Sequence, residues 1–261
     1  TETSEGFLKA MSSAATRIAL KDEMNAQNIA QTLWAFSSIA VVSGDQNVME
    51  LSNCTRALWD AARELDVRST LEVTLCTFFH AHLMCEELLG GSYGVNSQNS
   101  SSIKCKYPSW IQNQAKKEWI QNVNREVDVS RTHSLVAETL REMSHERKTG
   151  QVVVECLTAD EFFSLDIYLP ELDVGVEVDG PTHYFEKEQG EGGHEPSHIG
   201  KQSKTYSPTL STKLRDAFLQ ERCAAVIVVP WFEFDTLANS KQRSAYLVRK
   251  LQEAGIEVEE V

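Results

Sequence analysis

The stretch FSLDIYLPELDVGVEVDGPTHYF, residues 163–185, contains two apolar segments separated by the turn sequence Pro-Glu-Leu-Asp. Its β-branched and aromatic residues predict two strands joined as a hairpin. Glu177 and Asp179 lie two residues apart in the second strand, so their side chains point to the same face, while the valines beside them take the opposite face. The hairpin brings Asp166 of the first strand to the same region. The stretch therefore predicts a β-sheet that carries a cluster of three carboxylates.

A cluster of like charges at the end of an apolar strand is unfavourable unless a cation or a basic side chain neutralises it. Mg²⁺ is one candidate, because it prefers oxygen ligands from one or two carboxylates together with water and phosphate. The alternative needs no metal, since Asp179 precedes a Gly180-Pro181 turn and could accept hydrogen bonds from backbone amides beyond it. The residues alone leave both interpretations open.

Further elements extend the hairpin into a layered domain. Apolar spacings of three and four predict helices, and β-branched runs predict strands. In chain order we expect a helix (132–147), a strand (151–157), the hairpin, a helix capped by Ser211 or Thr212 (211–223), a buried strand (224–231) and a closing helix (240–255). The polar segment 186–210 is interpreted as a mobile insertion, and IEVEEV (256–261) as an acidic tail or edge strand. The order predicts an α/β domain, residues 131–261, with a mixed sheet flanked by helices.

The first half of the chain is helical by pattern. Apolar residues recur at intervals of three and four in the segments 6–20, 28–40, 48–66 and 69–83, and Asn25 is a plausible cap for the second segment. Pairing the segments gives a helix-hairpin period of about forty residues, which is within the range of helical solenoids. We therefore expect helical-hairpin repeats in residues 1–130, with a Gly/Ser-rich break near 90–107 and a polar helix after Pro108. The whole chain is expected to be α+β.

Composition and charge limit the classes of function. The chain has 261 residues, of which 41% are hydrophobic, and a formal net charge of −13. This acidic balance argues against salt-driven binding of the whole surface to nucleic acid, so any contact with RNA must be local. The sequence has no run of about 18 apolar residues, so no membrane span is expected. The six cysteines form no CxxC pair and mostly lie in apolar runs, which is typical of reduced core residues.

Four side chains in the helical half have both a functional and a structural interpretation. Cys76 and His80 are four residues apart on a predicted helix and could share a metal, but the two phenylalanines between them favour a core position. Trp34 and Trp59 fit the core of the repeats better than a platform for stacked bases.

Two stretches of the sequence resemble known families. The stretch 163–185, together with TKLRDAFLQERCAAVIVVPWFEF (212–234), resembles the RAP domain found at the C-terminus of many organellar RNA-binding proteins; its VIVVPWFEF part is interpreted as a strand. The likeness covers roughly residues 133–252. The RAP domain is itself similar to very-short-patch-repair endonucleases and to the PD-(D/E)xK nuclease fold. NIAQTLWAFSSIA (28–40) resembles the octotricopeptide and FAST-kinase-like helical repeats that precede RAP domains.

This resemblance implies roles for the carboxylates. Asp166 would take the position of the metal-binding aspartate and Glu177 that of the motif glutamate, and the two would hold Mg²⁺ if the site is active. The third motif position is normally lysine but is Asp179 here, so the group that would stabilise charge on the transferring phosphate is missing. Lys213 or Arg215, from the following helix, could supply it.

His183, two residues beyond Pro181, also has a place in the motif. The resemblance implies that it acts as a general base or contacts phosphate. The alternative is a packed aromatic cluster with Tyr184 and Phe185. Both interpretations remain open at this point.

The resemblance also implies a function. It predicts an RNA-associated component of an organellar ribonucleoprotein particle, in a mitochondrion or alternatively a plastid, with a non-catalytic RAP domain and no required cofactor. The particle would be the ribosome or RNA-processing machinery, and the partners would be RNA and other proteins of the particle. Candidate RNA contacts are Lys213, Arg215, Lys116 and Lys117. The alternative is a Mg²⁺-dependent endonuclease of the PD-(D/E)xK class that uses Asp166, Glu177 and a mobile Lys213, with the carboxylates holding Mg²⁺ and an activated water.

Overall fold

The computed structural model describes residues 2–21, 23–43, 45–89, 106–125, 130–145, 150–187 and 204–258. The chain divides into two compact units, Thr1–Arg125 and Glu126–Val261, and each is described by itself. The sequence pattern predicts the division at residue 130. The described strands all belong to the second unit and the first unit is helical, so the prediction of an α+β chain is confirmed.

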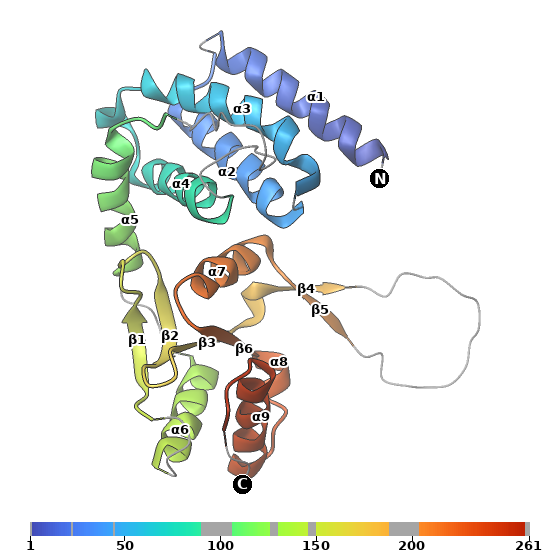
Figure 1. Ribbon diagram of the computed structural model, residues 1–261, viewed down its shortest axis with the longest axis vertical. Helices are drawn as coiled ribbons and strands as arrows, with labels where there is room; N and C mark the ends of the chain where they lie inside the picture. Colours follow the sequence, from blue (N-terminus) through green and yellow to red (C-terminus); the bar gives the residue numbers. More distant parts are fainter. Residues whose placement is uncertain are drawn as a thin grey trace, which may run out of the picture. The chain divides into compact units, whose positions relative to one another are not determined.

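The first unit contains the helices that the apolar spacing predicts. They are α1 (Glu2–Ala19), α2 (Ala26–Ser43), α3 (Asp45–Arg63), α4 (Glu72–Leu83) and α5 (Lys116–Val123) (Figure 1). A short 3₁₀ helix, η1 (Val67–Ser69), and two π-helical segments, η2 (Met84–Leu88) and η3 (Ile111–Ala115), lie between them. Helix α2 packs against both α3 and α4, and α3 also contacts α1. The predicted cap is confirmed, because Asn25 Oδ1 accepts a hydrogen bond of 2.9 Å from the backbone N–H of Asn28.

The second unit follows the predicted order of helix, three strands, helix, strand and helix, with short additions. Its elements are α6 (Arg131–His145), β1 (Val153–Leu157), β2 (Ser164–Leu169), β3 (Val174–Asp179), η4 (Pro181–His183), β4 (Tyr184–Lys187), β5 (Thr205–Pro208), α7 (Leu210–Gln220), β6 (Ala225–Pro230), α8 (Trp231–Phe234) and α9 (Ser240–Glu253).

Four strands form a mixed sheet in the order β1-β2-β3-β6. Strands β1, β2 and β3 pair antiparallel, and the predicted hairpin aligns Ile167 with Val176. Strand β6 pairs parallel to β3 along its whole length. A parallel pair needs a crossover connection, and the chain between β3 and β6 contains α7. This crossover brings α7 over the face of the sheet that carries the carboxylates.

Helices cover both faces of this sheet, with α6 and α9 on one side and α7 on the other (Figure 1). The side covered by α6 and α9 holds the core cluster. Its fully buried members include Val136, Leu140, Ile167, Leu169, Val174, Val176, Val229, Leu247 and Leu251. On the α7 side, Phe218 stacks on Phe163 with ring centroids 4.9 Å apart. Both faces of β3 are therefore shielded from solvent, including the face that carries Glu177 and Asp179.

Two predicted boundaries in this unit are wrong. Helix α7 is capped by Thr209 rather than by Ser211 or Thr212, because Thr209 has extended backbone angles and its side chain accepts from the N–H of Thr212. The segment VIVVPWFEF does not continue as a strand. Strand β6 ends at Pro230, and the next four residues form the helical turn α8.

The polar segment 186–210 has regular structure at both ends. Strands β4 and β5 pair antiparallel, with Tyr184 opposite Pro208 and Lys187 opposite Thr205, and Leu210 begins α7. The expectation of an insertion without structure is therefore wrong at these ends, and residues 188–203 lie outside the described residues. At the other end of the unit, residues 256–258 form no edge strand, and 259–261 again lie outside the described part.

The described part of the chain contains no helix long and apolar enough to cross a bilayer. Its five cysteines are free thiols, of which Cys54, Cys85 and Cys223 are buried. This placement agrees with the prediction of reduced core residues; Cys105 lies outside the described residues.

We expect Ile167→Ala to lower the free energy of unfolding by about 2–5 kcal/mol, because it removes a fully buried side chain from the core cluster and leaves a cavity. Leu157→Ala on the neighbouring strand β1 is the matched control, since Leu157 is 36% exposed. Urea denaturation of the full chain measures both. Equal losses in the two variants would contradict the placement of the core.

Candidate functional site

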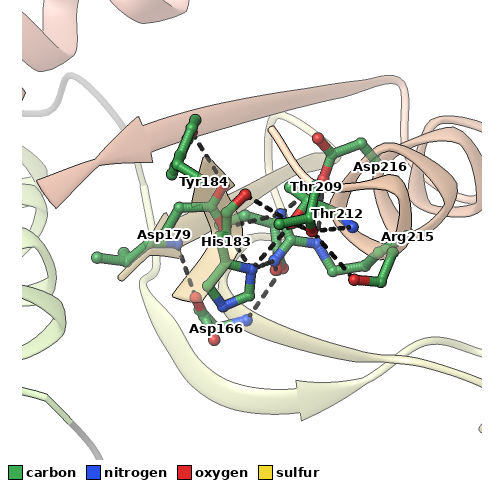
Figure 2. Close-up of polar contacts among 11 residues, drawn as sticks. Asp166, Asp179, His183, Tyr184, Thr209, Thr212, Arg215 and Asp216 are labelled. Atoms are coloured by element: carbon green, nitrogen blue, oxygen red, sulfur yellow. Dashed lines mark hydrogen bonds and ion pairs between the residues drawn. The ribbon is translucent and has the colours of Figure 1, made fainter. Parts of the chain in front are cut away.

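Glu177 and Asp179 of β3 form ion pairs with Arg215 of α7. Figure 2 shows Asp179 and Arg215 within this group of polar contacts. One guanidinium nitrogen, Nη1, lies 3.2 Å from Glu177 Oε2, and the other, Nη2, lies 2.8 Å from Asp179 Oδ1. Nη2 also lies 2.7 Å from Asp216 Oδ1, and Nε donates to the same oxygen at 3.0 Å. The basic group that the carboxylate cluster requires is therefore a side chain of the same unit.

The site is largely closed to water. Glu177 is 3% exposed and Asp179 is fully buried. Burial and the negative charge of Asp166 raise the pKa of Glu177 well above its usual range, although Arg215 opposes this shift. Burial acts to lower the pKa of Arg215, but the charges of Glu177, Asp216 and Asp179 outweigh it and raise that pKa. The guanidinium thus stays charged and holds the acidic pair together.

The partners of Asp179 are side chains. Besides Arg215, it accepts a hydrogen bond of 3.1 Å at Oδ2 from Tyr184 Oη, and its Oδ1 lies 3.5 Å from His183 Nδ1. Within the described residues its partners include no backbone amide beyond the Gly180-Pro181 turn. The partners of Asp179 are therefore side chains, with the Arg215 cation among them, and not the backbone amides that the metal-free interpretation predicted.

His183 lies at the rim of this cluster (Figure 2). Its Nδ1 is 3.3 Å from Thr212 Oγ1 and 3.4 Å from Arg215 Nη1, and 37% of its side chain is exposed. The aromatic cluster predicted for His183, Tyr184 and Phe185 is wrong, because Tyr184 packs against Phe232 instead and the described ring contacts do not include His183. Phe185, the third expected member, is 62% exposed.

Asp166 lies where the regular pairing of β2 and β3 stops, just before the aligned pair Ile167 and Val176. Its carboxylate Oδ2 accepts a hydrogen bond of 2.7 Å from the N–H of Val178, and its own N–H donates to Glu177 Oε1 at 3.3 Å. Side-chain carboxylates thus replace backbone hydrogen bonds at this point of the sheet. The three predicted carboxylates are brought together, as the hairpin implies.

This arrangement does not suit Mg²⁺ between Asp166 and Glu177. Glu177 already uses Oε2 for Arg215 and Oε1 for the N–H of Asp166, and one oxygen of Asp166 is used for Val178. A divalent cation bound to Glu177 would also lie close to the Arg215 guanidinium, which carries like charge. The pair would accept Mg²⁺ only after Arg215 moved away.

Of the two basic residues expected to reach the site from α7, Arg215 does and Lys213 does not. Lys213 is exposed and forms no ion pair with any described carboxylate. Two positions along a helix correspond to about 200° of rotation, so the two side chains leave opposite sides of α7. Lys116 and Lys117 lie on α5 of the first unit, and Lys117 is exposed.

Two residues at the edge of the site are absent from the sequence prediction. His133 of α6 and Glu155 of β1 lie beside Asp166, and one ligand atom from each of the three lies within 4.8 Å of the others. His133 shares its helix face with Val136 and Leu140, so the apolar spacing contained a signal that this histidine is buried. Glu155 has a positive φ of 51° inside a strand, which no sequence pattern indicates.

The first unit has a separate pocket of about 350 Å³, lined by Trp34, Cys76, His80 and Trp119 among others. Trp34 Nε1 donates to His80 Nδ1 at 3.1 Å, which supports a packed role for His80 rather than a shared metal with Cys76. Burial lowers the pKa of His80 to about 4, so the ring is neutral at physiological pH. Trp59 is buried, as the core interpretation predicts.

No protein-family model matches the chain, and no curated protein matches its sequence. The resemblance to the RAP domain therefore depends on the residues quoted above.

We expect Arg215→Gln to lower the free energy of unfolding by about 3–5 kcal/mol, because it leaves two buried carboxylates without their cation. Lys213→Gln removes the same charge from an exposed position of the same helix and should change stability by less than about 0.5 kcal/mol. Urea denaturation at neutral pH compares the two variants. Similar values for both would show that Arg215 is not required by the carboxylates.

The loss in Arg215→Gln should also depend on pH. A carboxyl group whose pKa is higher in the folded state than in the unfolded state does not lower the free energy of unfolding at a pH below its unfolded pKa. The free energy of unfolding falls as the pH rises from the unfolded pKa through the folded pKa. Without Arg215 the pKa of Glu177 rises further, so the difference between wild type and variant should shrink as the pH falls from about 8 towards 5. A difference that stays constant or grows over this range would contradict the prediction.

Proposed function

We propose that this chain is an RNA-associated component of an organellar ribonucleoprotein particle, and that its second unit is a non-catalytic, nuclease-like domain. The observation that carries the non-catalytic part is the guanidinium of Arg215 between Glu177 and Asp179. The association with RNA and the organellar location, a mitochondrion or alternatively a plastid, follow from the resemblance to RAP-domain proteins.

A nuclease of this class must present its carboxylates to a cation and to a substrate phosphate. Here Glu177 and Asp179 are buried, and both pair with the guanidinium of Arg215 inside the unit. Arg215 thus supports the fold at the position where catalysis would require an open metal site. A folded domain whose site is closed is suited to docking against other molecules of a particle.

The distribution of charge supports a role among other macromolecules. Most of the net charge of −13 belongs to the unit Glu126–Val261. An acidic surface repels the phosphates of free RNA but attracts basic partners, so contact with RNA would be local and shared with basic proteins of the particle. Exposed Lys213 and Lys117 remain the simplest candidates for such local contacts.

A second candidate function is a Mg²⁺-dependent endonuclease, and the position of His183 favours it. His183 is partly exposed and lies against Arg215, where a phosphate could contact both side chains. In this alternative, substrate would draw Arg215 away from Glu177. Asp166 and Glu177 would then hold the cation, and His183 would accept the proton of the attacking water.

Sedimentation of a native organellar extract on a gradient tests the proposal, with RNA crosslinked to this chain sequenced from each fraction. We expect the chain to migrate with a large ribonucleoprotein particle and to crosslink to its RNA at few positions. Migration only in light fractions without crosslinked RNA would contradict the proposal.

An activity assay separates the two candidates. Purified chain with Mg²⁺ or Mn²⁺ should cleave RNA and DNA no faster than its Glu177→Gln variant, in which the buried carboxylate is replaced by an amide of similar size. Cleavage by the wild type that Glu177→Gln abolishes would favour the endonuclease. Circular dichroism of both proteins ensures that the comparison is between folded chains.

A further inference from the structure

Three side chains with metal-binding groups converge beside Asp166 from three different elements. His133 comes from α6, Glu155 from β1 and Asp166 from β2. One ligand atom from each lies within 4.8 Å of the other two. Arg215 forms its ion pairs with Glu177, Asp179 and Asp216 and with none of these three residues. Asp166 adjoins the closed acidic pair through its N–H, which donates to Glu177.

The orientation of His133 is fixed by its surroundings. Its Nε2 lies 3.1 Å from the backbone oxygen of Asp166, and because a carbonyl oxygen can only accept, Nε2 carries the proton. The other nitrogen, Nδ1, lies 3.2 Å from Glu155 Oε1. In the neutral ring, Nδ1 directs a lone pair at a carboxylate oxygen, and this contact needs a proton or a metal ion between the two atoms. A backbone carbonyl that fixes the tautomer is a common feature of histidine ligands.

The two carboxylates are also held in position. Asp166 is anchored by the N–H of Val178, which leaves its second oxygen for another partner. Glu155 lies opposite Asp166 in the register of β1 and β2, since Val154 pairs with Ile167. Glu155 is exposed at the surface, whereas His133 is only 4% exposed. A cation could therefore enter from solvent on the Glu155 side and meet a buried imidazole.

Charge balance also favours a cation. Within the described residues, neither Glu155 nor Asp166 forms an ion pair with lysine or arginine, and His133 is the one basic side chain paired with Glu155. The two carboxylates carry two negative charges in a partly buried place. A divalent cation would balance both.

We propose that His133, Glu155 and Asp166 bind a divalent transition-metal cation of the Zn²⁺ or Mn²⁺ type. Imidazole together with carboxylates suits these ions, whereas Mg²⁺ prefers oxygen ligands alone. Metal–ligand bonds of about 2 Å place ligand atoms about 3–4 Å apart, so the exposed Glu155 would move slightly inward on binding. The bound ion would join α6 to β1 and β2. This inference does not depend on the proposed function.

The test is a titration of the full chain, freed of metal, with Zn²⁺, Mn²⁺ and Mg²⁺ by calorimetry. We expect one equivalent of Zn²⁺ or Mn²⁺ to bind, and Glu155→Gln to weaken that binding at least about tenfold. Glu138→Gln is the matched control, because it removes the same charge from an exposed position of α6, and it should bind like the wild type. Pulsed electron paramagnetic resonance of the Mn²⁺ complex should show coupling to an imidazole nitrogen.

Three outcomes would overturn the proposal. If no equivalent of either transition metal binds, or if Glu155→Gln binds as tightly as the wild type, the three residues form only an ion pair and a hydrogen bond. If Glu177→Gln abolishes binding while Glu155→Gln does not, the cation lies between Asp166 and Glu177 instead. None of these results involves RNA or a particle, so failure of the metal proposal is distinguishable from failure of the proposed function.

Discussion

The second unit depends on one interaction, the pairing of two buried carboxylates on a single strand with one guanidinium. Glu177 and Asp179 lie on the face of β3 that α7 covers, and neither could remain charged there without a cation. Arg215 provides that cation, so the position and rotation of α7 over the sheet are set by charge as well as by apolar packing. The parallel pairing of β3 with β6 places α7 in the connection where it can do so.

Asp166 links this interaction to the far edge of the sheet. Its N–H donates to Glu177, its carboxylate accepts from Val178, and its carbonyl accepts from His133. The hydrogen-bonded network therefore runs from α7 through β3 and β2 to α6. The strands depart from regular pairing where this network crosses them, which is how ligand-type side chains from α6 and β1 come close to Asp166.

The two sides of this network have different chemical character. On the α7 side the carboxylates share the guanidinium of Arg215, and Glu177 and Asp179 are closed to solvent. On the α6 side no described lysine or arginine pairs with the carboxylates, and one carboxylate is exposed. A closed acidic pair fits the proposed docking domain, and a cluster without a lysine or arginine partner fits a bound metal that stabilises this domain.

The sequence by itself determined the elements and the faces of this protein. The two-residue period of a strand places Glu177 and Asp179 on one face. The apolar spacing predicts the helices of both units, and the turn in residues 163–185 predicts the hairpin. All three features depend on local backbone geometry. The tertiary structure decided which distant side chains meet. Only the rotation of α7 selects Arg215 over Lys213, and only the packing of α6 brings His133 to Asp166. The pairing of β4 with β5 likewise joins two polar segments without a strand pattern. Contacts of this kind depend on how elements far apart in the chain pack, and the local pattern of residues does not contain that information.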